Sequence, residues 1–157
     1  MNSNDMSGGP APAKAERRIV IVDDEEIILD LMETFVRDWS KEATILRYQN
    51  RDEAWRGILR RDPDLLITDM RNGNVPGRSG AYGMSGFELL KLLADRLVKY
   101  PVLAASGSFE KSECEALAKQ CAGPHLNVSY LTKPFTKELF LQTLRKCLGP
   151  GDNHFGP

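Results

Sequence analysis

The sequence has no apolar run that approaches the roughly 20 residues of a membrane-spanning helix. Its first residues, MNSNDMSGGPAPAKAERR, lack the apolar core of a secretory signal. An excess of charge is also missing, because 21 lysines and arginines nearly balance 22 aspartates and glutamates. A strongly basic surface for nucleic acid is therefore not indicated. We expect a cytoplasmic protein with neither nucleic acid nor membrane among its partners.

Cysteine is scarce as well. The three cysteines, Cys114, Cys121 and Cys147, are odd in number and form no C-x-x-C motif. This spacing argues against a disulfide framework and against a zinc site, and it fits a reducing compartment.

The sequence does contain an alternation of short apolar runs and amphipathic segments between residues 17 and 148. Residues 1–16 and 149–157 lack such periodicity, so we predict a flexible tail on each side of a domain spanning 17–148. Strands are predicted at 19–22, 43–49, 65–69, 101–106 and 126–132. Helices are predicted at 28–39, 51–61, 87–97, 109–121 and 137–148, with Ser108 and Thr136 placed to cap the last two.

The fivefold alternation of strand and helix predicts a doubly wound α/β fold. Strands that are apolar along their whole length are typical of a parallel sheet covered on both faces. Right-handed crossovers then place helices on both sides. Each helix should turn an apolar stripe inward, with members that include Leu31, Leu59, Leu117 and Leu139. Ligands of such folds bind beyond the carboxyl ends of the strands.

Polar residues stand at the carboxyl ends of four predicted strands. They are Asp23, Asp24 and Glu25 after the first strand, Asp69 at the end of the third, Ser106 at the end of the fourth and Lys133 after the fifth. Carboxylates packed together repel one another and favour a hard cation with oxygen ligands, such as Mg²⁺. A lysine and a hydroxyl opposite them can bind phosphoryl oxygens, and a carboxylate beside that pair can accept a phosphoryl group covalently.

Each of these residues also has a simpler interpretation. An acidic pair after a strand is often an exposed helix N-terminus, where the helix dipole favours carboxylates. An isolated aspartate, a Ser-Gly or a Lys-Pro at a strand end is often only a turn. The indication of a site comes from the whole set, because the acidic residues, the hydroxyl and the lysine all stand at the carboxyl ends of strands and would meet at one edge of the sheet.

From about Arg17 to Leu148 the chain resembles a response regulator receiver domain, the phosphoacceptor module of two-component signal transduction, and it looks like the chemotaxis regulators of that family. The matching segments are IVIVDDE, LLITDMR, VLAASG and YLTKPF. The resemblance implies a flavodoxin-like fold of five βα units. Its five-stranded parallel sheet would have the strand order 2-1-3-4-5, with helices on both faces.

The resemblance also implies a metal and an acceptor. Asp69 matches the phosphorylated aspartate of the family. Asp23 and Asp24 match the acidic pair that binds Mg²⁺, with Asp24 as the more direct ligand. Arg71 would give its backbone carbonyl to the same ion.

A second group of residues matches the switch of the family. Ser106 and Lys133 correspond to the hydroxyl and the lysine that bind the phosphoryl group, and Tyr130 corresponds to the switch aromatic. The Lys133–Pro134 bond is expected to be cis, which is essentially a proline feature.

The implied partner is a histidine kinase or a histidine phosphotransfer protein that supplies phosphohistidine. Neither His125 nor His154 looks like a phosphodonor, so this chain should be the acceptor. Phosphorylation would draw Ser106 and Tyr130 inward and change the face made by the fourth helix, fifth strand and fifth helix. An unknown downstream protein would read that face, and a homodimer through it is left open. No enzyme activity is implied beyond self-catalysed phosphotransfer and dephosphorylation.

The loop after Asp69 departs from the family pattern. Gly-x-Ser-Gly occurs twice, in VPGRSG at Val75–Gly80 and in AYGMSG at Ala81–Gly86, so the loop is longer than the family's. One interpretation is a tolerated surface insertion, since lengthening a loop costs little closure entropy. The other is that Arg78 or Tyr82 covers the phosphoryl site or contacts a partner. The stretch between Ser106 and Lys133 is also longer than usual.

Other functions remain to be weighed against a phosphorylated receiver. A pseudo-receiver would act as an unphosphorylated protein-binding scaffold, but the full set of acidic, hydroxyl and lysine residues argues against it. A phosphohydrolase would place a second aspartate two residues after its nucleophile, where this chain has Arg71. No phosphate-cradling loop for a flavin or nucleotide follows the first strand. The chain has no room for an output domain after Leu148, unless it was cut from a longer protein.

Overall fold

The computed structural model of the chain describes residues 16–70, 83–107 and 112–152. Its strands form one parallel five-stranded sheet with the order β2-β1-β3-β4-β5. The strands are β1 (Arg18–Val22), β2 (Thr44–Tyr48), β3 (Leu65–Asp69), β4 (Val102–Ser106) and β5 (Val128–Thr132). The doubly wound fold and the strand order predicted above are confirmed.

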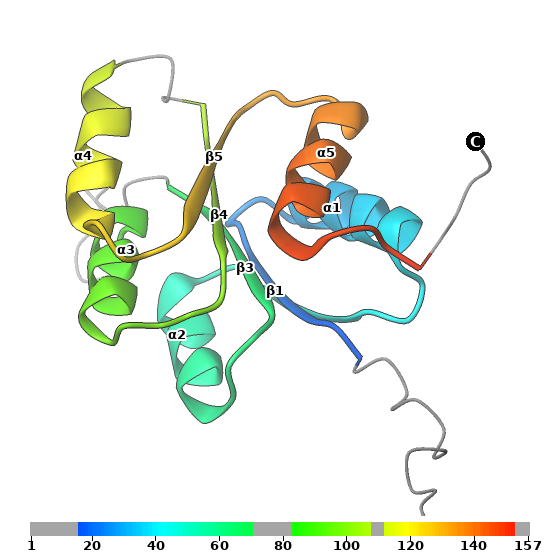
Figure 1. Ribbon diagram of the computed structural model, residues 1–157, viewed down its shortest axis with the longest axis horizontal. Helices are drawn as coiled ribbons and strands as arrows, with labels where there is room; N and C mark the ends of the chain where they lie inside the picture. Colours follow the sequence, from blue (N-terminus) through cyan, green and yellow to red (C-terminus); the bar gives the residue numbers. More distant parts are fainter. Residues whose placement is uncertain (1–15, 71–82, 108–111, 153–157) are drawn as a thin grey trace, which may run out of the picture.

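Helices cover both faces of the sheet. They are α1 (Glu26–Trp39), α2 (Arg51–Arg60), α3 (Gly86–Asp95), α4 (Ser112–Ala122) and α5 (Lys137–Leu148). Figure 1 shows α1 and α5 on one side of the sheet and α2, α3 and α4 on the other. Right-handed crossovers explain this arrangement, because the step from β1 to β2 runs in one direction along the sheet and the steps from β2 to β3, β4 and β5 run in the other.

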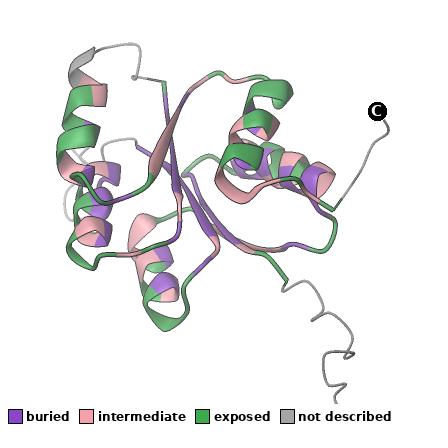
Figure 2. Cartoon of the chain, viewed as in Figure 1, coloured by how far each residue is buried: buried purple, intermediate pink, exposed green. Residues whose placement is uncertain are grey.

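The apolar strands supply both halves of the core. In β1, Ile19 and Ile21 pack into the cluster beneath α1 and α5, whereas Val20 and Val22 pack into the cluster beneath α2, α3 and α4. Successive side chains of a strand point to opposite faces, so a strand covered twice must be apolar throughout. Figure 2 shows this burial along the central strands. The central strands therefore present their polar chemistry only at their ends.

Side-chain caps fix where three of the helices begin. Asn50 accepts hydrogen bonds from the backbone amides of Asp52 (2.7 Å) and Glu53 (3.2 Å) at the start of α2. Ser85 caps α3 and Thr136 caps α5 in the same manner. Such caps satisfy amides that have no partner within the helix. The predicted Thr136 cap is confirmed, and Ser108 lies outside the described residues.

The predicted apolar stripes of the helices are partly wrong. Leu31, Leu59, Leu117 and Leu139 are exposed. The residues next to them in the sequence, Met32, Ile58, Ala118 and Phe140, also belong to the predicted stripes and are buried as expected. Each helix packs on one side of a sheet and has solvent on the other, so its buried stripe is narrower than the apolar pattern suggested.

The segment after α5 contacts the end of α1. Trp39 Nε1 donates a hydrogen bond of 3.1 Å to the carbonyl of Gly149, and Ser40 Oγ donates one of 2.6 Å to Asp152. A side chain at Gly151 would collide with the backbone of Trp39. Residues 149–152, predicted to start a tail, therefore pack on the domain.

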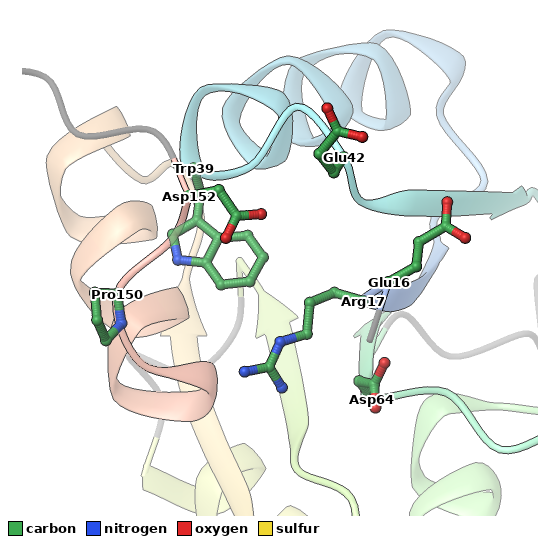
Figure 3. Close-up of a pocket in the computed structure, with 7 residues that line it drawn as sticks. All are labelled: Glu16, Arg17, Trp39, Glu42, Asp64, Pro150 and Asp152. Carbon is green, nitrogen blue, oxygen red and sulfur yellow. The ribbon is translucent and has the colours of Figure 1, made fainter. Parts of the chain in front are cut away.

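A cavity of about 900 Å³ lies beside this segment, at the amino ends of the strands (Figure 3). Its lining comes from both ends of the described chain, from the end of α1 and the connection to β2, and from the turn before β3. The residues are Glu16, Arg17, Trp39, Glu42, Asp64, Pro150 and Asp152. In the described part of the chain, no helix has the length and apolar character needed to cross a membrane.

Candidate functional site

The parallel sheet brings the polar strand ends to one edge. Asp69 is the last residue of β3 and Ser106 the last of β4, while Asp23 follows β1 and Lys133 follows β5 directly. Strands β1, β3, β4 and β5 are neighbours in this order, so their carboxyl ends adjoin. A cavity of about 430 Å³ opens here, and Asp69, Ser106 and Lys133 line it. The predicted convergence of these residues is therefore observed.

Lys133 connects two of the carboxylates. Its Nζ lies 2.6 Å from Asp23 Oδ2 and 3.3 Å from Asp69 Oδ1. The other oxygen of Asp23 accepts a hydrogen bond of 2.9 Å from the backbone amide of Glu25. Burial raises the pKa of Asp23 above its usual value, while the bonds from Lys133 and from the Glu25 amide oppose this shift. Both oxygens of Asp23 are thus engaged within the protein.

Three carboxylates are close enough to share one cation. One oxygen each from Asp23, Asp24 and Asp69 lies within 4.8 Å of the others. Asp23 and Asp69 are buried, and Asp24 is exposed. Hard oxygen donors of this kind suit Mg²⁺, which keeps several waters and takes one or two protein carboxylates. Arg71, whose carbonyl was predicted as a ligand, lies outside the described residues.

Ser106 and Tyr130 occupy neighbouring strands on the α4 side of the sheet. Ser106 is buried, and its carbonyl accepts a hydrogen bond of 3.0 Å from the amide of Lys133. Tyr130 pairs with Ala104 in the β4–β5 register, two residues before Ser106. The Nζ of Lys119 on α4 lies 6.0 Å from the centroid of the half-buried Tyr130 ring. The expected cis bond between Lys133 and Pro134 is present.

Arg51 belongs to this site but was absent from the sequence-based set. It opens α2, shortly after β2 ends at Tyr48. Its Nη1 donates a hydrogen bond of 3.1 Å to the carbonyl of Asp69, and its Nε donates one of 2.6 Å to the carbonyl of Met84. The signal that could have revealed it is its position, because the carboxyl end of β2 lies at the same edge of the sheet.

Comparison with known families and structures agrees with the fold. Residues 19–145 match the family model described as the response regulator receiver domain. The chain is 31% identical over 134 residues to the uncharacterized transcriptional regulatory protein YesN of Bacillus subtilis (strain 168), a match that covers 83% of this chain and 32% of YesN. It is 26% identical over 129 residues to the sensory transduction protein LytT of the same organism, covering 82% of this chain and 47% of LytT.

Solved structures share the fold. The signal receiver domain of an HD domain-containing protein from Pseudomonas fluorescens Pf-5 has a TM-score of 0.66 and 21% identity, covering 85% of this chain and 94% of that one. The chemotaxis response regulator CheY4 of Vibrio cholerae has a TM-score of 0.61 and 22% identity, covering 85% of this chain and all (100%) of CheY4. The chain spans less than half the length of the curated relatives YesN and LytT. The family match covers most of the chain, which therefore belongs to the response regulator receiver domains of two-component signalling.

Proposed function

We propose that this receiver domain accepts a phosphoryl group on Asp69 in a Mg²⁺-dependent reaction and then changes its partner-binding face. The observation that carries the proposal is the position of Asp69, buried at the end of β3 between the carboxylates of Asp23 and Asp24 and the ammonium group of Lys133. A carboxylate beside a cation site and a lysine is equipped for phosphoryl transfer.

Asp23, Asp24 and Asp69 would hold the Mg²⁺ ion, with the backbone carbonyl of Arg71 as a further ligand. The ion supplies neutralisation of the negative charge that gathers during transfer. Lys133 and the Glu25 amide already engage both oxygens of Asp23. This engagement supports exposed Asp24 as the more direct ligand.

In the proposed transfer, an oxygen of Asp69 attacks the phosphorus of a phosphohistidine. A new P–O bond forms as the P–N bond breaks, and the electron pair of the P–N bond stays on the imidazole of the donor. Lys133 and Ser106, which line the same cavity, bind the phosphoryl oxygens. Water later attacks the phosphorus, breaks its bond to the Asp69 oxygen, and so releases inorganic phosphate and restores the carboxylate. The chain needs no other enzyme activity for this cycle.

A protein phosphodonor fits the surroundings of the cavity. Ile28 and Leu31 of α1 line it together with Asp69, and Ile27 beside them is 73% exposed. Exposed apolar side chains next to a polar site favour contact with another protein. We therefore propose a histidine kinase or a histidine phosphotransfer protein as the donor.

The switch would operate through the neighbouring strands β4 and β5. Ser106 moves toward the phosphoryl group, and Tyr130 follows into the space that is vacated. Tyr130 packs against the core beneath α4 and lies under Lys119, so its movement alters contacts of α4. The population of the domain would shift from one conformation to the other. In the second conformation, the face of α4, β5 and α5 would bind a downstream protein or a second copy of this chain.

The cellular setting follows from the donor and from the cysteines. Histidine kinases and phosphotransfer proteins present phosphohistidine to receivers inside the cell, so we propose a cytoplasmic location. Cys114, Cys121 and Cys147 form no disulfide in the structure. Reduced thiols are expected in such a compartment.

The test is incubation with a small acyl-phosphate donor and Mg²⁺, followed by intact-mass measurement. One phosphoryl adduct on the native chain is expected, and it should be lost in Asp69→Asn and after chelation of the metal. An Asp69→Asn chain that still gains the adduct would show that another residue is the acceptor. A native chain that never gains it, with any donor, would instead favour the unphosphorylated scaffold.

A further inference from the structure

We propose that Arg51 is a positioning residue of the phosphoacceptor site, which fixes the main chain at Asp69 and supplies a permanent positive charge beside the acidic cluster. This inference rests on the proposed function, because it assigns a role to a further residue at the same site. Neither the sequence motifs nor the family match points to this position.

The first part of the argument is the geometry of the main chain. The carbonyl of Asp69 accepts hydrogen bonds from Arg51 Nη1 at 3.1 Å and from Thr68 Oγ1 at 3.0 Å. Arg51 Nε also binds the carbonyl of Met84 at 2.6 Å, and Asp52 accepts a bond of 2.9 Å from the Met84 amide. The first two residues of α2 therefore bind the carbonyl at the end of β3 and both the backbone amide and the carbonyl of Met84.

This arrangement requires an arginine. A guanidinium carries several donors in a fixed planar fork and can bind two carbonyls at once, whereas a lysine offers a single point charge. Asp69 precedes residues 71–82 in the sequence and Met84 follows them, so one side chain joins the two ends of the lengthened loop. We infer that the position of Asp69 does not depend on the length of that loop.

The second part of the argument is electrostatic. Burial lowers the pKa of the half-buried Arg51, while the carboxylates of Asp69, Asp24 and Asp23 act in the opposite direction. Arginine nevertheless remains charged throughout the accessible pH range. The three carboxylates of the cluster and the two cations beside them, Lys133 and Arg51, together carry a formal charge of −1.

A cation that enters this site must do so against the field of Arg51. Removing that charge should strengthen the binding of Mg²⁺, even if it loosens the main chain. A residue that serves only as a structural anchor gives the opposite result, since a loosened site binds its ligand more weakly. The direction of the change in affinity therefore separates the two roles.

The experiment is calorimetric titration of Mg²⁺ without any phosphodonor. Arg51→Gln removes the charge and should tighten binding by about fivefold at low salt, with a smaller gain at high salt. Arg51→Lys keeps the charge and should bind Mg²⁺ within about twofold of the native chain, since the Coulomb interaction with the ion depends on charge and distance. Arg56→Gln makes the same charge change on an exposed position of α2 and is the matched control, with affinity unchanged.

Hydrogen exchange tests the bridging role in the same proteins. Amide exchange at residues 83–86 should be faster in both Arg51 variants than in the native chain, because neither substitute binds both carbonyls. Unaltered exchange in both variants overturns the anchoring role. Weaker Mg²⁺ binding in Arg51→Gln, or equal affinities in the two variants, overturns the electrostatic role.

These outcomes are distinct from failure of the proposed function. A native chain that binds no Mg²⁺ at all contradicts the metal-dependent receiver and the electrostatic role of Arg51 together. A native chain that binds Mg²⁺ and becomes phosphorylated, with an unshifted affinity in Arg51→Gln, contradicts the role of Arg51 alone.

Discussion

Lys133 donates a hydrogen bond of 2.6 Å to Asp23, a residue 110 positions earlier in the chain. The side chain of Asp23 is fully buried and that of Lys133 is 17% exposed. This ion pair joins the end of β1 to the end of β5 across two intervening strands, and Asp69 lies beside it. The fold and the candidate chemistry therefore depend on the same contact.

Lys133→Met should destabilise the domain in the absence of Mg²⁺. It leaves Asp23 and Asp69 buried without their shared cation, and loss of one partner of a buried pair costs about 3 kcal/mol. Urea unfolding measures the free energy of unfolding, and added Mg²⁺ should restore part of the stability that the variant loses. The control is Lys137→Met, which breaks an exposed pair with Asp38 and should cost less than about 1 kcal/mol. Equal losses in the two variants would contradict the assignment.

Gly86→Ala should destabilise the domain by about 2–3 kcal/mol, because overpacking forces the backbone to shift. A Cβ at this position would lie 2.6 Å from Met70 Cα and 2.9 Å from the carbonyl of Asp69. Gly107→Ala is the control, since its Cβ would meet nothing closer than 4.0 Å among the residues that the structure describes. Denaturant midpoints compare the two, and similar midpoints would show that the start of α3 can move away from β3.

Deleting residues 149–157 should lower stability by about 1–2 kcal/mol through the loss of buried hydrogen bonds. Trp39 is only 4% exposed, and its indole donates to Gly149. In a Trp55→Phe background, the fluorescence of Trp39 should shift to the red as water reaches the ring. A chain that ends at residue 152 is the control and should retain the native spectrum. An unshifted spectrum in the shorter chain would refute the packing.

Cys147 should react slowly with alkylating reagents. Burial raises the pKa of its thiol above the usual value, with a weaker opposing effect from Ser129. The thiolate is the reactive form, so the rate should rise only at a pH above the usual thiol range, near 8.5. As pH rises, the Cys147 thiol ionises in the unfolded chain before it does so in the folded protein. The free energy of unfolding should therefore fall between the usual thiol pKa and the higher pKa of the folded state. Cys147→Ala should remove this part of the slope. A native alkylation profile centred on the usual thiol pKa would contradict the shift.

The strand ends were the most predictable part of the molecule. Strands buried on both faces must be apolar, so Asp23, Asp69 and Ser106 stand out where the apolar runs stop. Parallel topology then brings these residues to one edge without any knowledge of side-chain positions. This is why sequence reasoning identified the acidic cluster and the lysine beside it.

The residues that sequence reasoning missed act through contacts between distant segments. From the sequence, Arg51 is only the start of an amphipathic helix, whereas in the structure its hydrogen bonds go to the main chain at Asp69 and Met84. Residues 149–152 have no periodicity, and only the position of Trp39 explains their packing. The proposed roles of Arg78 and Tyr82 lie outside the described residues and stay predictions.

The cavity at the amino ends of the strands has a consequence for engineering. Glu16 and Arg17, which precede β1, line it together with Pro150 and Asp152, which follow α5 (Figure 3). The two ends of the domain thus lie side by side, at the amino ends of the strands and away from Asp69. Domains with adjacent ends tolerate circular permutation and insertion into host proteins. A host joined at this edge would leave the edge that carries Asp69 open on the far side.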